Sequence, residues 1–255
     1  MIGSTLTTPL EWISAGHTDQ GRVRQLNEDS IFDNATVGLW SVADGMGGHE
    51  SGEVASQLIT RTLQRVRTLP HLADAVDEVD DHLKAVNQAL FERGAAQGRM
   101  MGSTVVVVLA RIDLLALLWA GDSRAYLFRQ QQCFPLTRDH TQLEALIDQG
   151  EVLPEEAEGH TAGRVVTRAV GAAAELVLDV EVIRAEPGDW IILCSDGVGK
   201  HITDNELVSF TVGENPSDVV AQLISTVLKR GAVDNVSVIA LYAQISAATI
   251  TAVSN

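Results

Sequence analysis

Short apolar runs predict the strands of this chain. They consist mainly of aliphatic and β-branched side chains, and several are apolar at almost every position, as in strands buried on both faces. The connections between the runs at 104–112, 114–120 and 123–128 are too short for crossover helices, so these strands are expected to pair antiparallel. Burial on both faces predicts two stacked sheets with helices outside them. Strands are predicted at 11–17, 31–32, 38–43, 104–112, 114–120, 123–128, 176–184, 189–195 and 235–243.

Helices are predicted where apolar side chains recur every three or four positions. Pro70 separates the first two helices, and Gly94 and Gly98 mark the end of the second. Thr203 is a candidate N-cap, with Glu206 at the capping-box position three residues later. The helical stretches lie at about 51–66, 76–90, 142–149 and 217–230, with a further helix starting at 203.

The length of 255 residues suits one substantial domain. We expect a single domain over 1–255, with its core at about 11–243 and loose termini at 1–10 and 246–255. Residues 137–170 form a long polar insertion between strands, which we call the flap. Insertions of this length usually carry function or mobility.

Charge and cysteine content restrict the partners and the compartment. The net charge of −16 argues against nucleic acid or an anionic membrane as a main partner. Two cysteines, Cys133 and Cys194, argue against a disulfide framework, and Cys194 lies in an apolar run as a core residue would. The N-terminus has no signal-peptide pattern, and the most apolar window, 112–120, is too short to cross a membrane. We therefore expect a soluble, cytoplasmic protein.

Four aspartates occupy glycine-containing turns where an apolar strand ends or begins: Asp44, Asp122, Asp196 and Asp234. If these strands lie in one sandwich, the turns can converge on one end of it. Carboxylates brought together repel each other and need cations, and ligation by oxygen alone selects Mg²⁺ or Mn²⁺ over zinc. Two such ions about 3.5–4 Å apart can acidify a bridging water for in-line attack on phosphorus. The alternative is that the four aspartates are independent turn residues, and for any one of them taken alone this alternative stays open.

A series of sequence blocks, taken in order, resembles the metal-dependent Ser/Thr protein phosphatases, the PPM or type 2C family, and specifically its compact bacterial members. The resemblance covers roughly residues 11–243. Each block is a weak signal alone, whereas the ordered set is specific. The blocks are TDQGRVR at 18–24, NED at 27–29, VADGMGGH at 42–49, GST at 102–104, AGDSR at 120–124, LTRDHT at 136–141, TRAVG at 167–171, CSDG at 194–197 and DN at 234–235.

The resemblance implies an α+β fold, a four-layer α-β-β-α sandwich of two antiparallel sheets flanked by helices. It also implies a centre with two core Mn²⁺ or Mg²⁺ ions at one end, and a third, weaker ion as in bacterial members. Asp44 would bridge both core ions, and the Gly45 carbonyl would bind one of them. Asp196 and Asp234 would ligate the other core ion, and Asp122 would help to hold the third.

The same resemblance assigns residues around the metals and an activity. Arg24 would bind the substrate phosphate, for which a guanidinium offers a two-pronged donor. Glu28 and Asp29 would order metal-bound waters, and Asn235 would support the neighbouring ligands. The implied enzyme is a monomeric protein phosphatase in which a metal-bridging hydroxide attacks phosphoserine or phosphothreonine directly, without a phosphoenzyme. Its natural counterpart would be a Ser/Thr kinase, whose autophosphorylated form would be a substrate.

Two positions depart from the family pattern. Met46 stands where some eukaryotic relatives place a histidine that protonates the leaving alkoxide, and methionine cannot donate that proton. His49 is nearby, but packing at a helix start is the simpler interpretation. The flap is acidic from Glu151 to Glu158, which favours basic over acidic phosphosites as substrates.

Other functions fit parts of the sequence less well. Gly121-Asp122-Ser123 superficially resembles a serine hydrolase elbow, but strand-like sequence follows Ser123 where the elbow needs a helix. A P-loop NTPase is excluded because its glycine-lysine loop is missing from the sequence. The alternatives that stay open are a regulatory phosphatase of the same fold acting on a dedicated signalling protein or a small phosphoester, and a catalytically silent phosphoprotein-binding module.

Overall fold

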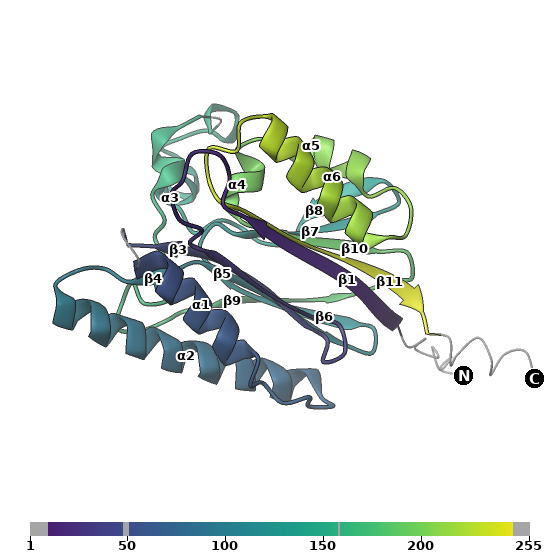
Figure 1. The fold of residues 1–255 in the computed structure, drawn as a ribbon, viewed down its shortest axis with the longest axis horizontal. Helices are drawn as coiled ribbons and strands as arrows, with labels where there is room; N and C mark the ends of the chain where they lie inside the picture. The colour runs from purple at the N-terminus through teal and green to yellow at the C-terminus, as the bar shows by residue number, and fades with distance from the viewer. Residues whose placement is uncertain (1–9, 48–50, 158, 247–255) are drawn as a thin grey trace, which may run out of the picture.

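Two antiparallel sheets stack face to face in this protein, and helices cover both outer faces (Figure 1). The computed structural model describes residues 10–47, 51–157 and 159–246. The first sheet has the order β1-β11-β10-β7-β8. The second has the order β2-β3-β5-β6-β9, with β4 paired to β3. The predicted α-β-β-α sandwich is therefore confirmed.

The elements have the following bounds. The strands are β1 (Leu10–Asp19), β2 (Asp29–Asn34), β3 (Leu39–Met46), β4 (Gly102–Ser103), β5 (Val105–Arg111), β6 (Leu114–Ala120), β7 (Arg124–Arg129), β8 (Gln132–Pro135), β9 (Asp179–Arg184), β10 (Trp190–Cys194) and β11 (Val236–Ile245). The α-helices are α1 (Ser51–Leu63), α2 (Leu72–Gln97), α3 (Gln142–Asp148), α4 (Asp196–Gly199), α5 (Asp204–Leu207) and α6 (Pro216–Lys229). Short 3₁₀ helices are η1 (Pro154–Glu156), η2 (Thr161–Arg164) and η3 (Val208–Phe210).

Three apolar layers hold the sandwich together. The central layer lies between the sheets, where Trp12 and Trp40 meet edge to face with ring centres 6.1 Å apart. A second layer packs α1 and α2 on the second sheet through side chains such as Ile59 and Leu83. A third layer packs α6 on the first sheet through residues such as Leu223. Burial of one large apolar side chain stabilises the fold by about 1.5–3 kcal/mol. The three layers together hold the sheets and helices in place, and with them the loops at the end of the sandwich.

One predicted strand pairing is wrong. The runs at 104–112 and 114–120 pair with each other as β5 and β6. The run at 123–128 instead forms β7, which pairs with β10 and β8 in the first sheet. The chain changes sheets at Gly121, whose φ of +117° suits glycine. A connection too short for a helix can still cross from one sheet to the other, so its length alone does not prove pairing.

Helix boundaries differ from the sequence pattern most clearly in the second helix and in the helix after Thr203. The second helix continues through Gly94 and ends before Gly98, which adopts the left-handed conformation at φ +62°. The capping box at Thr203 is confirmed, because its side chain accepts from the Glu206 backbone N–H. The helix that it begins is only the single turn α5, followed by η3. The short elements β4, β8, α4, η1 and η2 were not predicted.

The start of β1 and the end of β11 lie side by side, at the side of the sandwich opposite α3 (Figure 1). Leu10 begins β1 and pairs with Ile245 near the end of β11, so both strands extend slightly beyond the predicted core. The loose termini predicted at 1–10 and 246–255 otherwise lie outside the described residues, apart from Leu10 and Ser246. Within the described ranges, no helix is long and apolar enough to span a bilayer.

Candidate metal centre

Asp44 lies where β3 approaches the start of α1. The pairing of β2 with β3 places Asp29 opposite Asp44. The backbone N–H of Gly45 donates to the Glu28 carbonyl at 3.0 Å. A Cβ on Gly45 would lie 2.1 Å from the Gly52 carbonyl oxygen, so only glycine allows this approach. The glycine after Asp44 thus fixes the carboxylate between two strands and a helix.

Asp196 and Asp234 come from two turns in close backbone contact. Asp196 begins α4 directly after β10, and Asp234 precedes β11. A Cβ on Gly197 would lie only 1.9 Å from the Asn235 carbonyl oxygen. The two turns can touch because residue 197 is glycine, and their contact brings the two carboxylates together.

Two side-chain cations contact these carboxylates. Lys200 Nζ lies 2.5 Å from Asp196 Oδ2 and 2.6 Å from Asp234 Oδ2. Arg24 binds Asp234 with two prongs, Nε to Oδ1 at 2.7 Å and Nη2 to Oδ2 at 2.8 Å. Burial raises the pKa of Asp234, but the hydrogen bonds from Arg24 and Lys200 outweigh burial and the net pKa is lowered. Asp234 is therefore held as a carboxylate by two cations.

Asp29 lies behind these residues in the interior. It is 5% exposed, and its Oδ2 accepts hydrogen bonds from the Ser195 and Ser237 hydroxyls, both at 2.7 Å. Burial raises the pKa of Asp29 to about 6, although the two hydroxyl hydrogen bonds act in the opposite direction. Its orientation is thus set by Ser237 in β11 and by Ser195, the residue between β10 and α4.

The pKa shifts indicate that the predicted aspartates converge. Burial raises the pKa of Asp44 well above its usual value, and the charges of Asp29, Asp196, Asp122 and Asp234 raise it further. Burial, followed by the charge of Asp196, raises the pKa of Asp122 to about 7. Carboxylates disfavour each other's ionisation only at short range, so these side chains form one acidic cluster.

The donors of this cluster suit a hard divalent cation. Every acidic donor is an oxygen, as Mg²⁺ and Mn²⁺ prefer. Among the described residues, buried Glu28 Oε1 and Asp29 Oδ1 have no hydrogen-bond partner, which is costly for a polar atom. No three acidic, histidine or cysteine side chains of the described ranges already surround one point. In this structure Asp196 and Asp234 contact the side-chain cations of this chain. The oxygen donors of the cluster thus fit a divalent ion in their chemistry, although these two aspartates are paired with positively charged side chains.

Asn235 joins the loop that carries Arg24 to the turn before β11. It is 6% exposed. Its Nδ2 donates to the Gln20 and Leu26 carbonyl oxygens at 2.8 and 2.9 Å. Its Oδ1 accepts from the Glu28 backbone N–H at 2.9 Å. One side chain therefore fixes both ends of the loop and the distance between Arg24 and the acidic cluster.

The flap begins beside Asp122. The backbone N–H of His140 donates to the Gly121 carbonyl at 2.9 Å, and His140 Nδ1 accepts from the Gly121 N–H at 3.2 Å. The flap then contains α3, η1 and η2. Met46 ends β3 and pairs with Gly102. His49, the other candidate near this position, lies outside the described residues.

The serine hydrolase interpretation has no structural support. Ser123 is 2% exposed, and its Oγ lies 2.7 Å from Thr104 Oγ1. The strand β7, not a helix, follows it. Cys194 is buried in β10, and burial raises the pKa of its thiol to about 12, as expected for a core residue.

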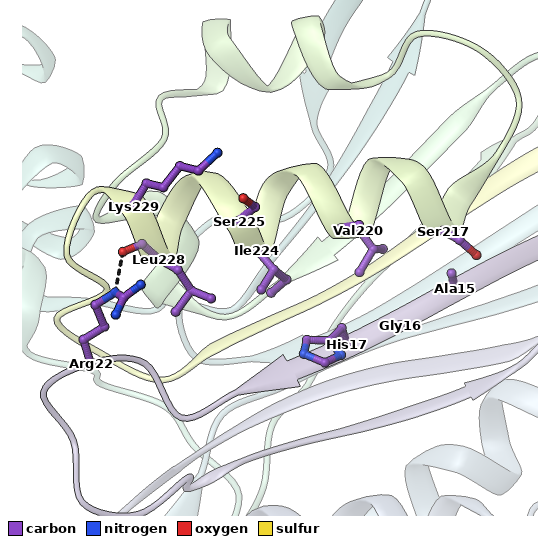
Figure 2. A pocket seen from close by; sticks show the side chains of 11 residues that line it. Ala15, Gly16, His17, Arg22, Ser217, Val220, Ile224, Ser225, Leu228 and Lys229 are labelled. Carbon is purple, nitrogen blue, oxygen red and sulfur yellow. Dashed lines mark hydrogen bonds between the residues drawn. The ribbon is translucent and has the colours of Figure 1, made fainter.

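A cavity of about 560 Å³ lies away from the acidic cluster, between β1 and α6 (Figure 2). Ala15, Val220 and Ile224 are among the residues that line it. Arg22 lies at one end, where its Nε donates to the Leu228 carbonyl at 2.7 Å. None of the predicted site residues lines this cavity, so cavity size does not locate the acidic chemistry.

Lys200 was missed by the sequence analysis. A lysine four residues after Asp196 would face it if the intervening residues formed a helical turn. That turn, α4, is too short to show a hydrophobic period. Burial lowers the pKa of Lys200, but the charges of Asp196 and Asp234 outweigh it, so Lys200 stays protonated.

The chain thus combines two stacked sheets between helices with a set of carboxylates near one end of the sandwich. The model of the family described as Protein phosphatase 2C matches residues 15–236, so the chain belongs to this family. The predicted family is therefore confirmed.

Similar proteins include phosphatases from bacteria. The serine/threonine protein phosphatase PstP of Mycobacterium tuberculosis is 35% identical over 232 residues; the match covers 88% of this chain but 44% of PstP, so the chain spans less than half of that relative. The structure of PppA, a key regulatory component of T6SS in Pseudomonas aeruginosa, is 37% identical with a TM-score of 0.85, covering 91% of this chain and 97% of the other. The catalytic domain of PstP with two manganese ions has a TM-score of 0.82 at 32% identity, covering 92% and 99%. Its ions agree with the predicted cofactor.

Proposed function

We propose that this chain is a metal-dependent phosphatase that hydrolyses phosphoserine and phosphothreonine in proteins. The observation that carries the proposal is that Lys200 bridges Asp196 and Asp234 and Arg24 contacts Asp234, with Asp44 near enough for the charges of both aspartates to raise its pKa. Family membership and the similarity to PstP support it. We further propose that residues 1–255 act as one domain with its core at 11–243, which the family match over 15–236 supports.

Arg24 is proposed to bind the substrate phosphate. Its side chain is 51% exposed, and its planar fork donates to both oxygens of Asp234 in this structure. A phosphate presents a similar pair of acceptor oxygens, so the same fork can bind it in two-pronged fashion. The hydrogen bond to Asp234, with the nearby negative charges, raises the pKa of Arg24 and keeps it charged.

The acidic cluster is proposed to hold two core Mn²⁺ or Mg²⁺ ions. Asp44 would bridge both, the Gly45 carbonyl would bind one, and Asp196 and Asp234 would bind the other. Asp122 would help to hold a third, weaker ion. When bound, such ions acidify a water so that it can attack phosphorus directly at neutral pH.

The residues around the cluster are proposed to orient water. The oxygens Glu28 Oε1 and Asp29 Oδ1 lack partners among the described residues and can each accept a hydrogen bond from a water. Ser195 and Ser237 hold the other oxygen of Asp29, so the free oxygen has a fixed direction. The thioether of Met46 cannot donate a proton, so a metal-bound water or another group is proposed to protonate the leaving alkoxide.

The substrates are proposed to be phosphoproteins of a cytoplasmic signalling system, including an autophosphorylated Ser/Thr kinase, with the phosphatase acting as a monomer. An ATP-dependent kinase is the class of enzyme that makes phosphoserine and phosphothreonine, and it works where ATP is available. A second candidate is a regulatory phosphatase with one dedicated signalling protein as its substrate. The similarity to PppA, a regulatory component in its own organism, favours this second candidate.

The test is release of phosphate from a phosphothreonine peptide in Mn²⁺ and in EDTA. We expect turnover only with Mn²⁺, and a fall of more than about 100-fold in Asp196→Asn, because loss of even an indirect partner of a metal costs about 10–100-fold. Asp77→Asn, at an exposed position on α2, is the control and should retain full activity. Metal-independent turnover, or full activity of Asp196→Asn, would contradict the proposal.

A further inference from the structure

We propose that Lys200 is an internal counter-cation that competes with the divalent ion for Asp196 and Asp234. The inference rests on the proposed function, because it concerns the same metal centre. It adds a regulatory property: the chain carries its own competitor for the metal and therefore sets the concentration of metal at which the centre fills.

Lys200 is positioned by the same turn that positions Asp196. Its backbone N–H donates to the Asp196 carbonyl at 3.0 Å, which closes the single turn of α4. Its side chain then projects four residues beyond Asp196, on the same face of the turn. The ammonium lies 2.5 Å from Asp196 Oδ2 and 2.6 Å from Asp234 Oδ2, and so bridges the two carboxylates.

The ammonium and a divalent ion require the same oxygens. A carboxylate oxygen that makes a short contact with Lys200 cannot at the same time bind an ion without bringing two positive charges into contact. Asp234 is engaged on both oxygens, since Arg24 donates to Oδ1 and Oδ2 and Lys200 also contacts Oδ2. Binding of an ion through the Oδ2 atoms of Asp196 and Asp234 therefore requires Lys200 to move away, and at Asp234 it also requires Arg24 to release that oxygen.

Lys200 can move because its side chain reaches solvent. It is 37% exposed, and a Cβ added at the neighbouring Gly199 would meet no atom within 4 Å. A lysine has a flexible stem of four carbons, so its ammonium can exchange the carboxylates for water without a change of fold. The cost is loss of an ion pair that, without metal, offsets the repulsion between Asp196 and Asp234.

Two consequences follow from this competition. Without metal, Lys200 stabilises the fold by neutralising part of the acidic cluster. With metal, the same contact weakens binding, because the ion must displace the ammonium. Removal of the Lys200 charge should therefore tighten metal binding and destabilise the metal-free protein.

The test uses full-length protein and Mn²⁺ alone. Calorimetric titration of Lys200→Gln should show the Mn²⁺ affinity raised about tenfold, and thermal unfolding in EDTA should show a lower Tm than wild type. Lys84→Gln is the matched control, since Lys84 Nζ lies 2.6 Å from Asp80 Oδ2 in the same i,i+4 spacing on α2. It should leave both the Mn²⁺ affinity and the size of the Mn²⁺-induced rise in Tm unchanged. Lys200→Arg keeps the charge and should bind Mn²⁺ about as wild type does.

Each result separates the hypotheses. Equal or weaker Mn²⁺ binding by Lys200→Gln, with wild-type binding intact, would overturn the competition but leave the proposed function standing. Absence of Mn²⁺ binding to wild type would contradict both. If Lys200→Gln does not fold in EDTA, it is refolded in Mn²⁺ and its Mn²⁺ affinity is measured by competition with a chelator of known affinity. We expect Lys200→Gln to retain Mn²⁺ more tightly than wild type. Faster loss of Mn²⁺ to the chelator than from wild type would overturn the inference.

Discussion

Replacement of Asn235 by alanine should separate the stability of the fold from the placement of Arg24. Asn235 makes three hydrogen bonds to backbone groups of the loop that carries Arg24, namely to Gln20, Leu26 and Glu28. Alanine removes all three and leaves two carbonyl oxygens and one N–H in a site that is 6% exposed.

The magnitude follows from the bonds that are lost. A buried hydrogen bond contributes about 1 kcal/mol net, so Asn235→Ala should lower the free energy of unfolding by about 3 kcal/mol. For a chain of this size that is a fall in Tm of about 6–12 °C. The released loop should also place Arg24 less well, so KM for a phosphopeptide should rise beyond what the lost stability explains.

Asn87→Ala provides a matched control. Asn87 is 2% exposed and also makes three backbone hydrogen bonds, donating to the Ala173 and Ala174 carbonyls and accepting from the Gly171 N–H. Urea unfolding should show similar losses for both variants. Phosphopeptide kinetics, below the unfolding transition and in saturating Mn²⁺, should show a raised KM for Asn235→Ala only. Equal KM values in the two variants, or a stability loss below about 1 kcal/mol for Asn235→Ala, would refute this role of Asn235.

Three further predictions follow from the site. Gly197→Ala would place a Cβ 1.9 Å from a backbone carbonyl oxygen, and urea unfolding should show a loss of several kcal/mol of stability. Gly199→Ala is the control: its Cβ would lie in open space, so the stability should change by less than about 0.5 kcal/mol. Similar losses in the two variants would contradict the close contact at Gly197. Burial raises the pKa of Asp29 in the folded protein to about 6, above the ordinary 3.8 of an aspartate. The folded state therefore binds more protons, and the Tm of metal-free protein should fall as pH rises from 4 to 6. Asp29→Asn should flatten that fall, and an unchanged slope would show that another group carries it. Replacement of Glu155 and Glu156 by lysine should reduce selectivity for basic over acidic phosphopeptides, measured as a ratio of kcat/KM, and unchanged ratios would count against an electrostatic role of the flap.

Much of the fold follows from local patterns in the sequence. The apolar runs of β5, β6 and β10 and the stripe of α6 carry their own period, so their type and approximate bounds are predictable. The sheet to which β7 belongs is not, because pairing with β10 or β6 depends on the direction taken at Gly121 and not on β7 itself. The local periodicity of apolar residues predicts the type of each element. The assignment of strands to sheets depends on the turn at Gly121, and the residues of that turn do not show which direction the chain takes.

The site shows the same division. Asp44, Asp196 and Asp234 are predictable because each follows or precedes an apolar run at a glycine turn. The partners of Asn235 are not, since they lie 207 to 215 residues away in the sequence and meet it only after β1 and β11 have paired. Lys200 escapes prediction for another reason, since the single turn of α4 is too short for any periodic signal.

Location of the metal ions by anomalous diffraction tests the central claim most directly. Crystals of the protein grown with Mn²⁺ would be measured at the manganese absorption edge. We expect two strong anomalous peaks that share Asp44 as a ligand, with Asp196 and Asp234 on one of them and Lys200 turned away from both carboxylates. Peaks elsewhere on the surface, or no peak within ligating distance of Asp44, would contradict it.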